Sequence, residues 1–244
     1  MTTRALFRED AYLLRCEATV TAVDETGIRL DQTVFYPLGG GQAGDSGTLT
    51  RADGTVIVIA DTHKARFEGA TPDDALHVPA PDQDALLAGL SPGERVVAEI
   101  DWARRHRHMR LHTAGHLACA VLPYPVDGCS VTADYVRIDF ATVEPIERAH
   151  VEARLDALVR GRHPVSIEWI TDEDMAARPE LVRTMSVKPP QGLGRVRLLR
   201  IESVDLQPCG GTHVRDTGEV GTLRVAKLEK KSARTRRLVL ELVE

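Results

Sequence analysis

The sequence predicts an α+β protein, in which a small N-terminal β-barrel domain is followed by a two-layer α/β domain of antiparallel sheet and helices. Three observations predict this fold. Residues 11–100 consist of short β-rich runs separated by glycine-containing turns. Residues 103–121 contain no proline and many helix formers. The C-terminal part alternates between strand-forming runs and one amphipathic helical pattern. We therefore expect domains at residues 1–100 and 101–244.

The N-terminal elements follow from alternation and turn signals. The run "YLLRCEATVTAVDETGIRLD" (12–31) alternates loosely between apolar and polar residues, and "DETG" supplies a turn between two β-rich halves. Residues 33–61 continue the pattern, with glycine-rich turns and a hairpin expected at "RADGT" (51–55). "SPGERVVAEID" (91–101) indicates a turn that leads into a strand, which ends the predicted barrel near Ile100.

The C-terminal part begins with the helix expected over 103–121. A second helix is expected over 143–162, with Pro145 in its first turn and Gly161 at its end. "DEDMAARPE" (172–180) indicates a short third helix. Strand-forming residues dominate five further segments, which are 134–141, 164–170, 195–201, 220–231 and 234–243.

Composition places the chain among soluble globular proteins. Of its 244 residues, 43% are hydrophobic and 27% charged, and only 4% are aromatic. No apolar run approaches the roughly 20 residues that span a bilayer. The start, "MTTRALFRED", has acidic residues where a secretion signal has an apolar stretch, so we expect a cytoplasmic protein with no membrane partner. The four scattered cysteines are expected to be thiols or metal ligands rather than disulfides.

Charge is distributed unevenly along the chain. Residues 1–100 carry 8 Lys and Arg against 16 Asp and Glu, whereas residues 101–244 carry 23 against 20. Within the second part, residues 219–237 hold seven basic and two acidic side chains. This balance predicts a phosphate-bearing partner on the C-terminal part. A solvated basic surface without a partner is the alternative.

Two pairs of potential metal ligands have matching spacing. His112 and His116 are four residues apart on the predicted helix, which puts them on one face. Cys209 and His213 are also four apart, with two glycines between them that allow a tight turn. Imidazole and thiolate donors favour zinc over magnesium or calcium. Some histidines of the helix, which also contains His106 and His108, can equally be surface residues, and only the fold can bring the distant pairs together.

Three motifs, in this order, resemble one family. "FYPLGGGQAGDSGTL" (35–49), "HTAGH" (112–116) and "CGGTHVRDTGEVGTLRV" (209–225) resemble the editing domain of alanyl-tRNA synthetase. The chain has no room for the other synthetase domains. It is therefore similar to the freestanding editing proteins of the AlaX group, in their medium-length form with an N-terminal β-barrel domain.

The resemblance implies a function and a cofactor. Such proteins hydrolyse tRNA(Ala) that carries a wrong amino acid, most often serine and in some members glycine. The resemblance implies that a zinc ion is held by His112, His116, Cys209 and His213, and that residues 101–244 form the editing domain. It implies no ATP requirement. A nucleotide cofactor is not expected either, because the Gly-Lys-Ser/Thr ending of a phosphate loop is absent. Oligomeric state stays open.

Gln42 and Thr113 are the expected catalytic side chains beside the metal. An amide both donates and accepts hydrogen bonds, so Gln42 can hold a water or a seryl hydroxyl, while Gly40 and Gly41 let the backbone approach the substrate. Thr113 is a candidate to read the hydroxyl, although its side chain can instead bond to its own helix, and Thr212 and Asp205 are further candidates. The glycines can also simply form a turn between strands.

Gly115 and the basic residues concern specificity and RNA binding. The family resemblance implies a larger residue, often Ala or Thr, where this chain has Gly115. Gly115 is therefore expected either to enlarge the pocket or to admit a backbone contact, and the preference for serine, glycine or another amino acid stays open. Arg105, Lys230 and Arg236 are expected to contact tRNA. Two other functions remain possible: a non-catalytic tRNA-binding module with structural zinc, and a zinc hydrolase of another small ester.

Overall fold

The computed structural model describes residues 2–183 and 194–243. Contacts between residues divide the chain into two compact units. The first unit comprises residues 1–39 and 43–106, and the second comprises residues 40–42 and 107–244. The short segment Gly40–Gln42 therefore groups with the second unit, although its neighbours in sequence belong to the first.

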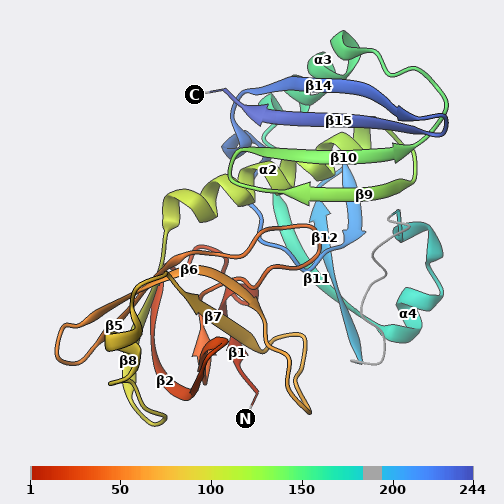
Figure 1. Cartoon of the computed structure of the whole chain (residues 1–244). Helices are drawn as coiled ribbons and strands as arrows, with labels where there is room; N and C mark the ends of the chain where they lie inside the picture. The colour runs from red at the N-terminus through yellow and green to blue at the C-terminus, as the bar shows by residue number, and fades with distance from the viewer. Residues whose placement is uncertain (1, 184–193, 244) are drawn as a thin grey trace. The chain divides into compact units, whose positions relative to one another are not determined.

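The first unit is built on a closed six-stranded antiparallel barrel with the strand order β2-β3-β7-β6-β5-β8, as the sequence predicted (Figure 1). Alternate side chains point inward and are buried, as in Val20, Ile28, Leu49 and Ile57. The expected hairpin at "RADGT" joins β5 to β6. The barrel strands are β2 (Arg15–Asp24), β3 (Gly27–Leu30), β5 (Gly47–Arg51), β6 (Val56–Lys64), β7 (Ala75–Pro79) and β8 (Arg95–Ile100).

Short elements complete this unit. Strand β1 (Arg4–Ala5) pairs in parallel with β4 (Gln32–Thr33), and a 3-10 turn, η1 (Leu6–Arg8), follows β1. Helix α1 (Asp84–Leu87) lies in the Pro- and Asp-rich segment before β8. These pieces carry none of the residues expected to form the metal site.

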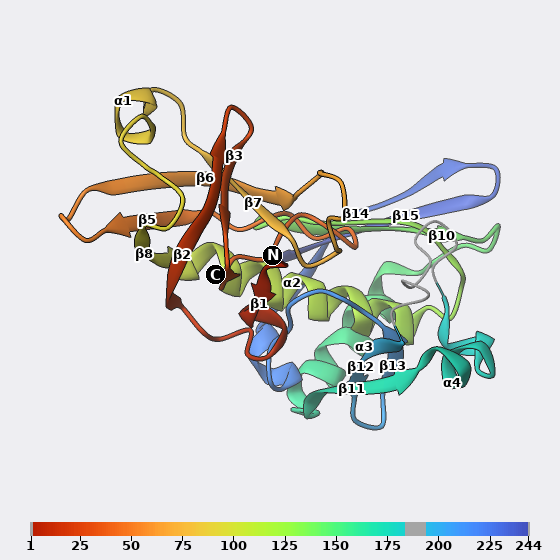
Figure 2. The ribbon, with the colours of Figure 1, turned by 90° about the horizontal axis from the view of Figure 1, so that it is seen from below.

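The second unit places one long helix between two sheets. Helix α2 (Trp102–Val121) lies between the four-stranded sheet β14-β15-β10-β9 and the three-stranded sheet β11-β12-β13 (Figure 2). Met109, Leu111, Ala114, Leu117 and Ala118 are all buried, so the helix is apolar on several sides, as expected for a helix covered on both faces. The strands are β9 (Val126–Val131), β10 (Tyr135–Ala141), β11 (Val165–Thr171), β12 (Arg195–Ile201), β13 (Asp205–Pro208), β14 (Leu223–Ser232) and β15 (Thr235–Leu242).

The remaining helices are short and peripheral. Helix α3 (Arg148–Arg160) begins three residues after Pro145, because the first helical hydrogen bond runs from Val151 to the carbonyl of Glu147, so the prediction of Pro145 in the first turn was wrong. Gly161 caps its end as expected. Helix α4 (Asp172–Ala176) starts with a capping box at Thr171. The 3-10 turns η2 (Pro179–Leu181) and η3 (Thr217–Val220) complete the elements.

In the second unit, two of the described strands were not predicted by the sequence analysis. β9 has a glycine and a cysteine in its middle and lacks clear alternation, and β13 has only four residues. Among the described residues, no helix is both long enough and apolar enough to cross a bilayer.

Candidate metal centre

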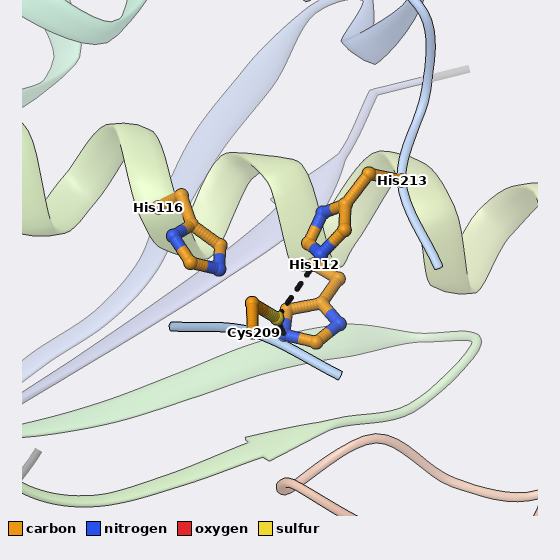
Figure 3. Close-up of side chains that lie close together, drawn as sticks. All are labelled: His112, His116, Cys209 and His213. Atoms are coloured by element: carbon orange, nitrogen blue, oxygen red, sulfur yellow. Dashed lines mark hydrogen bonds between the residues drawn. The ribbon is translucent and has the colours of Figure 1, made fainter. Parts of the chain in front are cut away.

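His112, His116, Cys209 and His213 converge in the interior of the second unit (Figure 3). One potential ligand atom from each lies within 4.8 Å of all the others. The sulfur of Cys209 is 3.6 Å from Nε2 of His112 and 3.2 Å from Nε2 of His213. The fold thus brings together the two pairs that the sequence analysis singled out.

Local structure explains how each pair is presented. His112 and His116 lie one helical turn apart on α2, and their ring centres are 5.5 Å apart. Cys209 and His213 lie in the loop that follows β13. Gly211 is required in this loop, because a Cβ at that position would overlap the ring of His112 and lie 2.9 Å from Oε1 of Gln42. The loop therefore passes against the helix at the point where the ligands meet.

Gln42 orients the first imidazole. Its amide oxygen accepts hydrogen bonds from Nδ1 of His112 at 2.8 Å and from the backbone nitrogen of Thr212 at 3.0 Å. Its amide nitrogen donates to Oγ1 of Thr212 at 2.9 Å. Because an amide oxygen can only accept, the proton of His112 sits on Nδ1, which leaves Nε2 unprotonated and facing the sulfur. Gln42 is fully buried and holds a ligand, rather than presenting its amide to open space.

Thr113 orients a second imidazole in the same way. Its hydroxyl donates to the carbonyl of Met109 at 2.9 Å, one turn back along α2. The hydroxyl oxygen then accepts from Nδ1 of His213 at 3.2 Å, so Nε2 of His213 is also left for the cluster. Burial lowers the pKa of His213 to about 3, which keeps it neutral as a metal ligand must be.

Asp205 partners the third imidazole. Its Oδ2 is 3.2 Å from Nδ1 of His116 and also accepts from Nε2 of Gln207 at 2.8 Å. Nη2 of Arg183 lies 3.5 Å from the other carboxylate oxygen. Burial opposes protonation of His116, but the hydrogen bond to Asp205 and the nearby Cys209 outweigh it and raise its pKa to about 10. Without a metal this imidazole therefore carries a second proton, which would be released when a metal ion binds. All three histidines therefore have a partner on Nδ1.

Cys209 is held as a ready thiolate. Burial opposes its ionisation, but the electrostatic interactions with His112 and His213 and the hydrogen bonds from His112 and His116 outweigh burial and hold the pKa of the thiol well below its usual value. The loop that carries it is anchored by Arg197, whose Nη1 donates to the carbonyls of Cys209 at 2.7 Å and Gly211 at 3.0 Å. Arg197 on β12 thus lies beside Cys209, which directly follows β13.

The arrangement fits a metal ion. Three imidazole nitrogens and one thiolate are donors that zinc accepts in tetrahedral sites, where neighbouring ligand atoms lie about 3.3–3.7 Å apart. The two sulfur–nitrogen distances, 3.6 and 3.2 Å, are close to that range. A hydrogen-bond partner on the far nitrogen of each ligating histidine is the usual outer-shell arrangement of such centres. The cluster can therefore hold a metal ion.

The glycine-rich segment extends β9 as a short parallel partner. The carbonyl of Gly41 accepts from the backbone nitrogen of Val131 at 2.7 Å, and Gln42 bridges to the same residue. Gly40 and Gly41 have φ angles of +58° and +84°, and a Cβ on Gly41 would lie 2.9 Å from the carbonyl oxygen of Cys129. Glycine here allows the turn that delivers Gln42 to His112.

Gly115 faces away from the cluster. A Cβ at this position would meet Cγ2 of Val136 at 3.3 Å and Cδ1 of Ile138 at 3.9 Å, both on β10. The missing side chain lets α2 approach that sheet closely. The expectation that Gly115 enlarges a pocket around the metal is therefore corrected, because its open side is filled by β10.

The basic residues divide into buried and exposed ones. Arg105 is fully buried in the first unit, where its Nε lies 3.0 Å from Asp45 and its Nη1 donates to the carbonyl of Ala11 at 2.9 Å. The expected contact of Arg105 with RNA is corrected, because its guanidinium is enclosed by these partners. Lys230 is exposed on β14 and stands directly opposite Arg236 on β15.

Part of the basic tail is engaged by one buried carboxylate. Asp139 on β10 lies 2.9 Å from Nζ of Lys231, 2.8 Å from Nε of Arg237 and 3.1 Å from Nη1 of Arg137. The guanidinium of Arg236 donates to the carbonyls of Ser232 and Val143. Of the two tail residues expected to contact RNA, Lys230 therefore presents the more open side chain.

The sequence analysis missed Arg197, and it considered Asp205 only as a candidate to read the seryl hydroxyl, not as the partner of His116. Both sit at alternate positions of short strands and point to the face that carries Cys209. A charged residue at an inward position of a strand is the signal that marks them, because such a residue needs a buried partner.

Comparisons with known proteins agree with the geometry. Residues 196–239 match the family model described as the threonyl and alanyl tRNA synthetase second additional domain. An alanyl-tRNA editing protein AlaX-M of Methanosarcina mazei is 33% identical, over 99% of this chain and 97% of that protein. An AlaX-L editing protein of Pyrococcus horikoshii is 32% identical, over 93% of this chain and 55% of its own length. An alanine–tRNA ligase of Ignicoccus hospitalis is also 32% identical, over 93% of this chain and 24% of the ligase.

Proposed function

The chain belongs to the AlaX-M family of alanyl-tRNA editing proteins, and from that premise we propose that it hydrolyses tRNA(Ala) carrying a wrong amino acid. The substrate is most often Ser-tRNA(Ala), with Gly-tRNA(Ala) as a second one. The enzyme is a zinc-dependent deacylase that cleaves the ester between amino acid and ribose. It acts in the cytoplasm and, because the reaction is a hydrolysis, requires no ATP.

One observation carries the proposal. His112, His116, Cys209 and His213 converge, and each histidine has a hydrogen-bond partner on Nδ1 that leaves Nε2 for a metal ion. A cluster of buried histidines without a metal would need no such uniform orientation. Three imidazoles held with Nε2 toward one point, together with a cysteine sulfur, therefore support a metal-binding site.

His112, His116, Cys209 and His213 would hold the zinc ion. When bound, zinc supplies Lewis-acid polarisation of an ester carbonyl or activation of a water molecule. Gln42 and Thr113 hold two of the ligands in the required tautomer, so we assign them as positioning residues. Asp205 does the same for His116 and adds negative charge behind it. Arg197 keeps Cys209 in place through the loop backbone.

The need for editing follows from the small difference between serine and alanine. An apolar pocket in which a synthetase attaches an amino acid to tRNA rejects an amino acid with an added hydroxyl only about 100-fold. A second site that binds the hydroxyl can remove the error afterwards. The Gly40–Gln42 turn and the Thr212 backbone border the cluster, and we propose that the seryl group is bound beside them.

Hydrolysis and tRNA binding are assigned to different residues of the chain. Residues 101–244 form the editing domain, to which Gln42 contributes from the preceding sequence. The neighbours Lys230 and Arg236 contact phosphates of tRNA(Ala). These contacts predict salt-dependent affinity.

A deacylation panel tests the proposal. The protein is incubated with Ser-, Gly- and Ala-tRNA(Ala) and with Ser-tRNA(Thr), before and after chelation and after readdition of zinc. We expect rapid release of serine from tRNA(Ala), slower release of alanine, loss of turnover on chelation and recovery with zinc. Cys209→Ala is expected to lose metal and activity together.

The controls separate the alternatives. Cys16→Ala removes a thiol of the first unit and is expected to leave metal content and activity unchanged. Full activity of Cys209→Ala would show that the metal site is wrongly assigned. Tight tRNA binding without turnover, metal loaded or not, would identify a binding module instead. Hydrolysis of small esters but of no aminoacyl-tRNA would identify a different hydrolase.

A further inference from the structure

Trp169 on β11 is an exposed aromatic side chain in a chain with only ten Phe, Trp and Tyr residues in total. It keeps 43% of its surface exposed, although it lies within a strand of a packed sheet. Tryptophan is highly buried on average, so the exposed indole leaves a large apolar surface available for contact, and its surroundings decide what it can bind.

A cation covers one side of the indole. The guanidinium carbon of Arg195 lies 4.3 Å from the ring centre of Trp169. Arg195 is the first residue of β12 and is itself exposed. The guanidinium lies over one face of the ring, so an exposed apolar surface and a positive charge stand together. Proteins that bind single-stranded nucleic acid use this combination to stack bases next to phosphates.

Strand register places Trp169 close to the metal centre. Trp169 pairs with Arg197 on β12, and the backbone nitrogen of Cys209 donates to the carbonyl of Arg197 at 3.1 Å. The three residues thus lie side by side at one level of the sheet. Neighbouring strands are about 4.8 Å apart, so the backbones of Trp169 and Cys209 are separated by roughly 10 Å.

The indole is on the same face of the sheet as the metal ligand. Directly paired residues project to one face, so Trp169 shares the face of Arg197. Arg197 points to the Cys209–Gly211 loop, to whose carbonyls it donates. Asp205, at an alternate position of β13, points to the same face and reaches His116. The exposed indole therefore lies on the sheet face that carries Cys209 and Asp205.

We propose that Trp169, flanked by Arg195, stacks an unpaired nucleobase at the 3′ end of the charged tRNA. The proposal rests on the proposed function, because it is the ester at that 3′ end that must reach the metal centre. The stacked base fixes the single strand beside the cluster, and Arg195 faces its phosphate. The platform reads no sequence, because every base has a face that can stack.

Fluorescence of Trp169 tests the contact directly. The chain has two tryptophans, so Trp102→Phe leaves Trp169 as the sole indole reporter. Uncharged tRNA(Ala) is titrated into this variant, and so is the same tRNA trimmed of its unpaired 3′ nucleotides. We expect quenching by intact tRNA and none by trimmed tRNA at equal occupancy, with occupancy followed by anisotropy of labelled RNA. Equal quenching by both RNAs, or none by either, overturns the proposal.

Kinetics give a second readout with a matched control. Trp169→Ala is expected to raise KM for Ser-tRNA(Ala) about tenfold to a hundredfold, the loss of one base–aromatic stack, while Trp169→Phe retains most of the affinity. Ile167→Ala changes the residue two positions earlier on the same strand face, exposed to 36%, and is expected to leave KM unchanged. Thermal unfolding of each variant shows that the fold is intact.

The two proposals fail in different ways. The stacking contact alone is overturned if the protein deacylates Ser-tRNA(Ala), the emission of Trp169 in Trp102→Phe does not change on RNA binding, and Trp169→Ala leaves KM unchanged. Absence of deacylation by the zinc-loaded wild-type protein overturns the proposed function. Quenching by an unrelated protein partner but not by RNA would assign this surface to protein binding and also overturn the stacking contact.

Discussion

The side-chain oxygen of Gln42 accepts a 2.8 Å hydrogen bond from Nδ1 of His112, a residue 70 positions further along the chain. This bond determines which nitrogen of His112 is free to bind a metal. Equivalent bonds link Thr113 to His213 and Asp205 to His116. Three different chemical groups, an amide, a hydroxyl and a carboxylate, thus perform the same task around one cluster.

Removing the amide of Gln42 should weaken metal binding. In Gln42→Leu, His112 loses its acceptor and its tautomer is no longer selected, so we expect zinc affinity to fall about 10- to 100-fold. Competition with a chromogenic chelator measures the change. Gln32→Leu, which alters an exposed glutamine bonded to the carbonyl of Glu17, serves as the control. Wild-type affinity in Gln42→Leu would show that the bond does not orient the ligand.

Thr113 offers a finer test, because serine and valine separate the hydroxyl from the shape. Thr113→Val keeps the volume but cannot accept from Nδ1 of His213, whereas Thr113→Ser keeps the hydroxyl. We expect about tenfold weaker zinc binding in the valine variant and near-normal binding in the serine variant. If both variants lose affinity equally, packing rather than the hydrogen bond holds His213.

The sequence revealed the ligand pairs and pointed to Gln42 and Thr113 beside the metal, but it did not reveal which imidazole each partner holds, for a physical reason. A four-residue spacing on α2 and a glycine-containing loop at Cys209 are local features, so the pairs are visible in the sequence. Gln42 and Asp205 reach the histidines from segments far away in the chain, and no local pattern predicts which side chain a fold will bring to Nδ1.

The same limit explains the errors at Gly115 and Arg105. Gly115 directly precedes His116, which suggested a role in the pocket, and Arg105 lies in the histidine-rich run, which suggested a contact with tRNA. Helix α2 turns Gly115 toward β10, and Arg105 is used to neutralise the buried Asp45. The barrel itself was predictable, because alternating apolar residues and glycine turns are features that repeat along each strand. Strand β9 was not, because a close packing partner rather than its own residues keeps it extended.

Gly211→Ala should disrupt the cluster without touching a ligand. The new methyl group would overlap the ring of His112, so the loop or the ring must move. We expect reduced zinc content of the purified protein and a loss of stability of a few kcal/mol, typical of overpacking. Gly128→Ala is the matched control, since a Cβ there meets only Oδ2 of Asp139, at 3.8 Å. Normal zinc content in Gly211→Ala would mean that the loop adjusts freely.

The lowered pKa of Asp139 predicts how the free energy of unfolding depends on pH. Burial raises the pKa of its carboxyl, but hydrogen bonds and charge from Arg237 and Lys231 outweigh it and lower the pKa to about 2, from 3.8. The unfolded chain therefore binds a proton at higher pH than the folded one. The stabilisation, about 2 kcal/mol, is present above pH 4 and is lost as the pH falls toward 2.

Asp139→Asn removes that contribution and leaves Arg137, Lys231 and Arg237 clustered without their anion. We expect a free energy of unfolding lower by about 2 kcal/mol at pH 7, and a smaller decline between pH 4 and pH 2 than in the wild type. Urea unfolding of the metal-free protein at several pH values measures both. Asp134→Asn, at the exposed turn before β10, should change neither. If the free energy of unfolding depends on pH in the same way in both variants, Asp139 does not stabilise the three neighbouring cations. Lys231 and Arg237 would then be available to bind a phosphate.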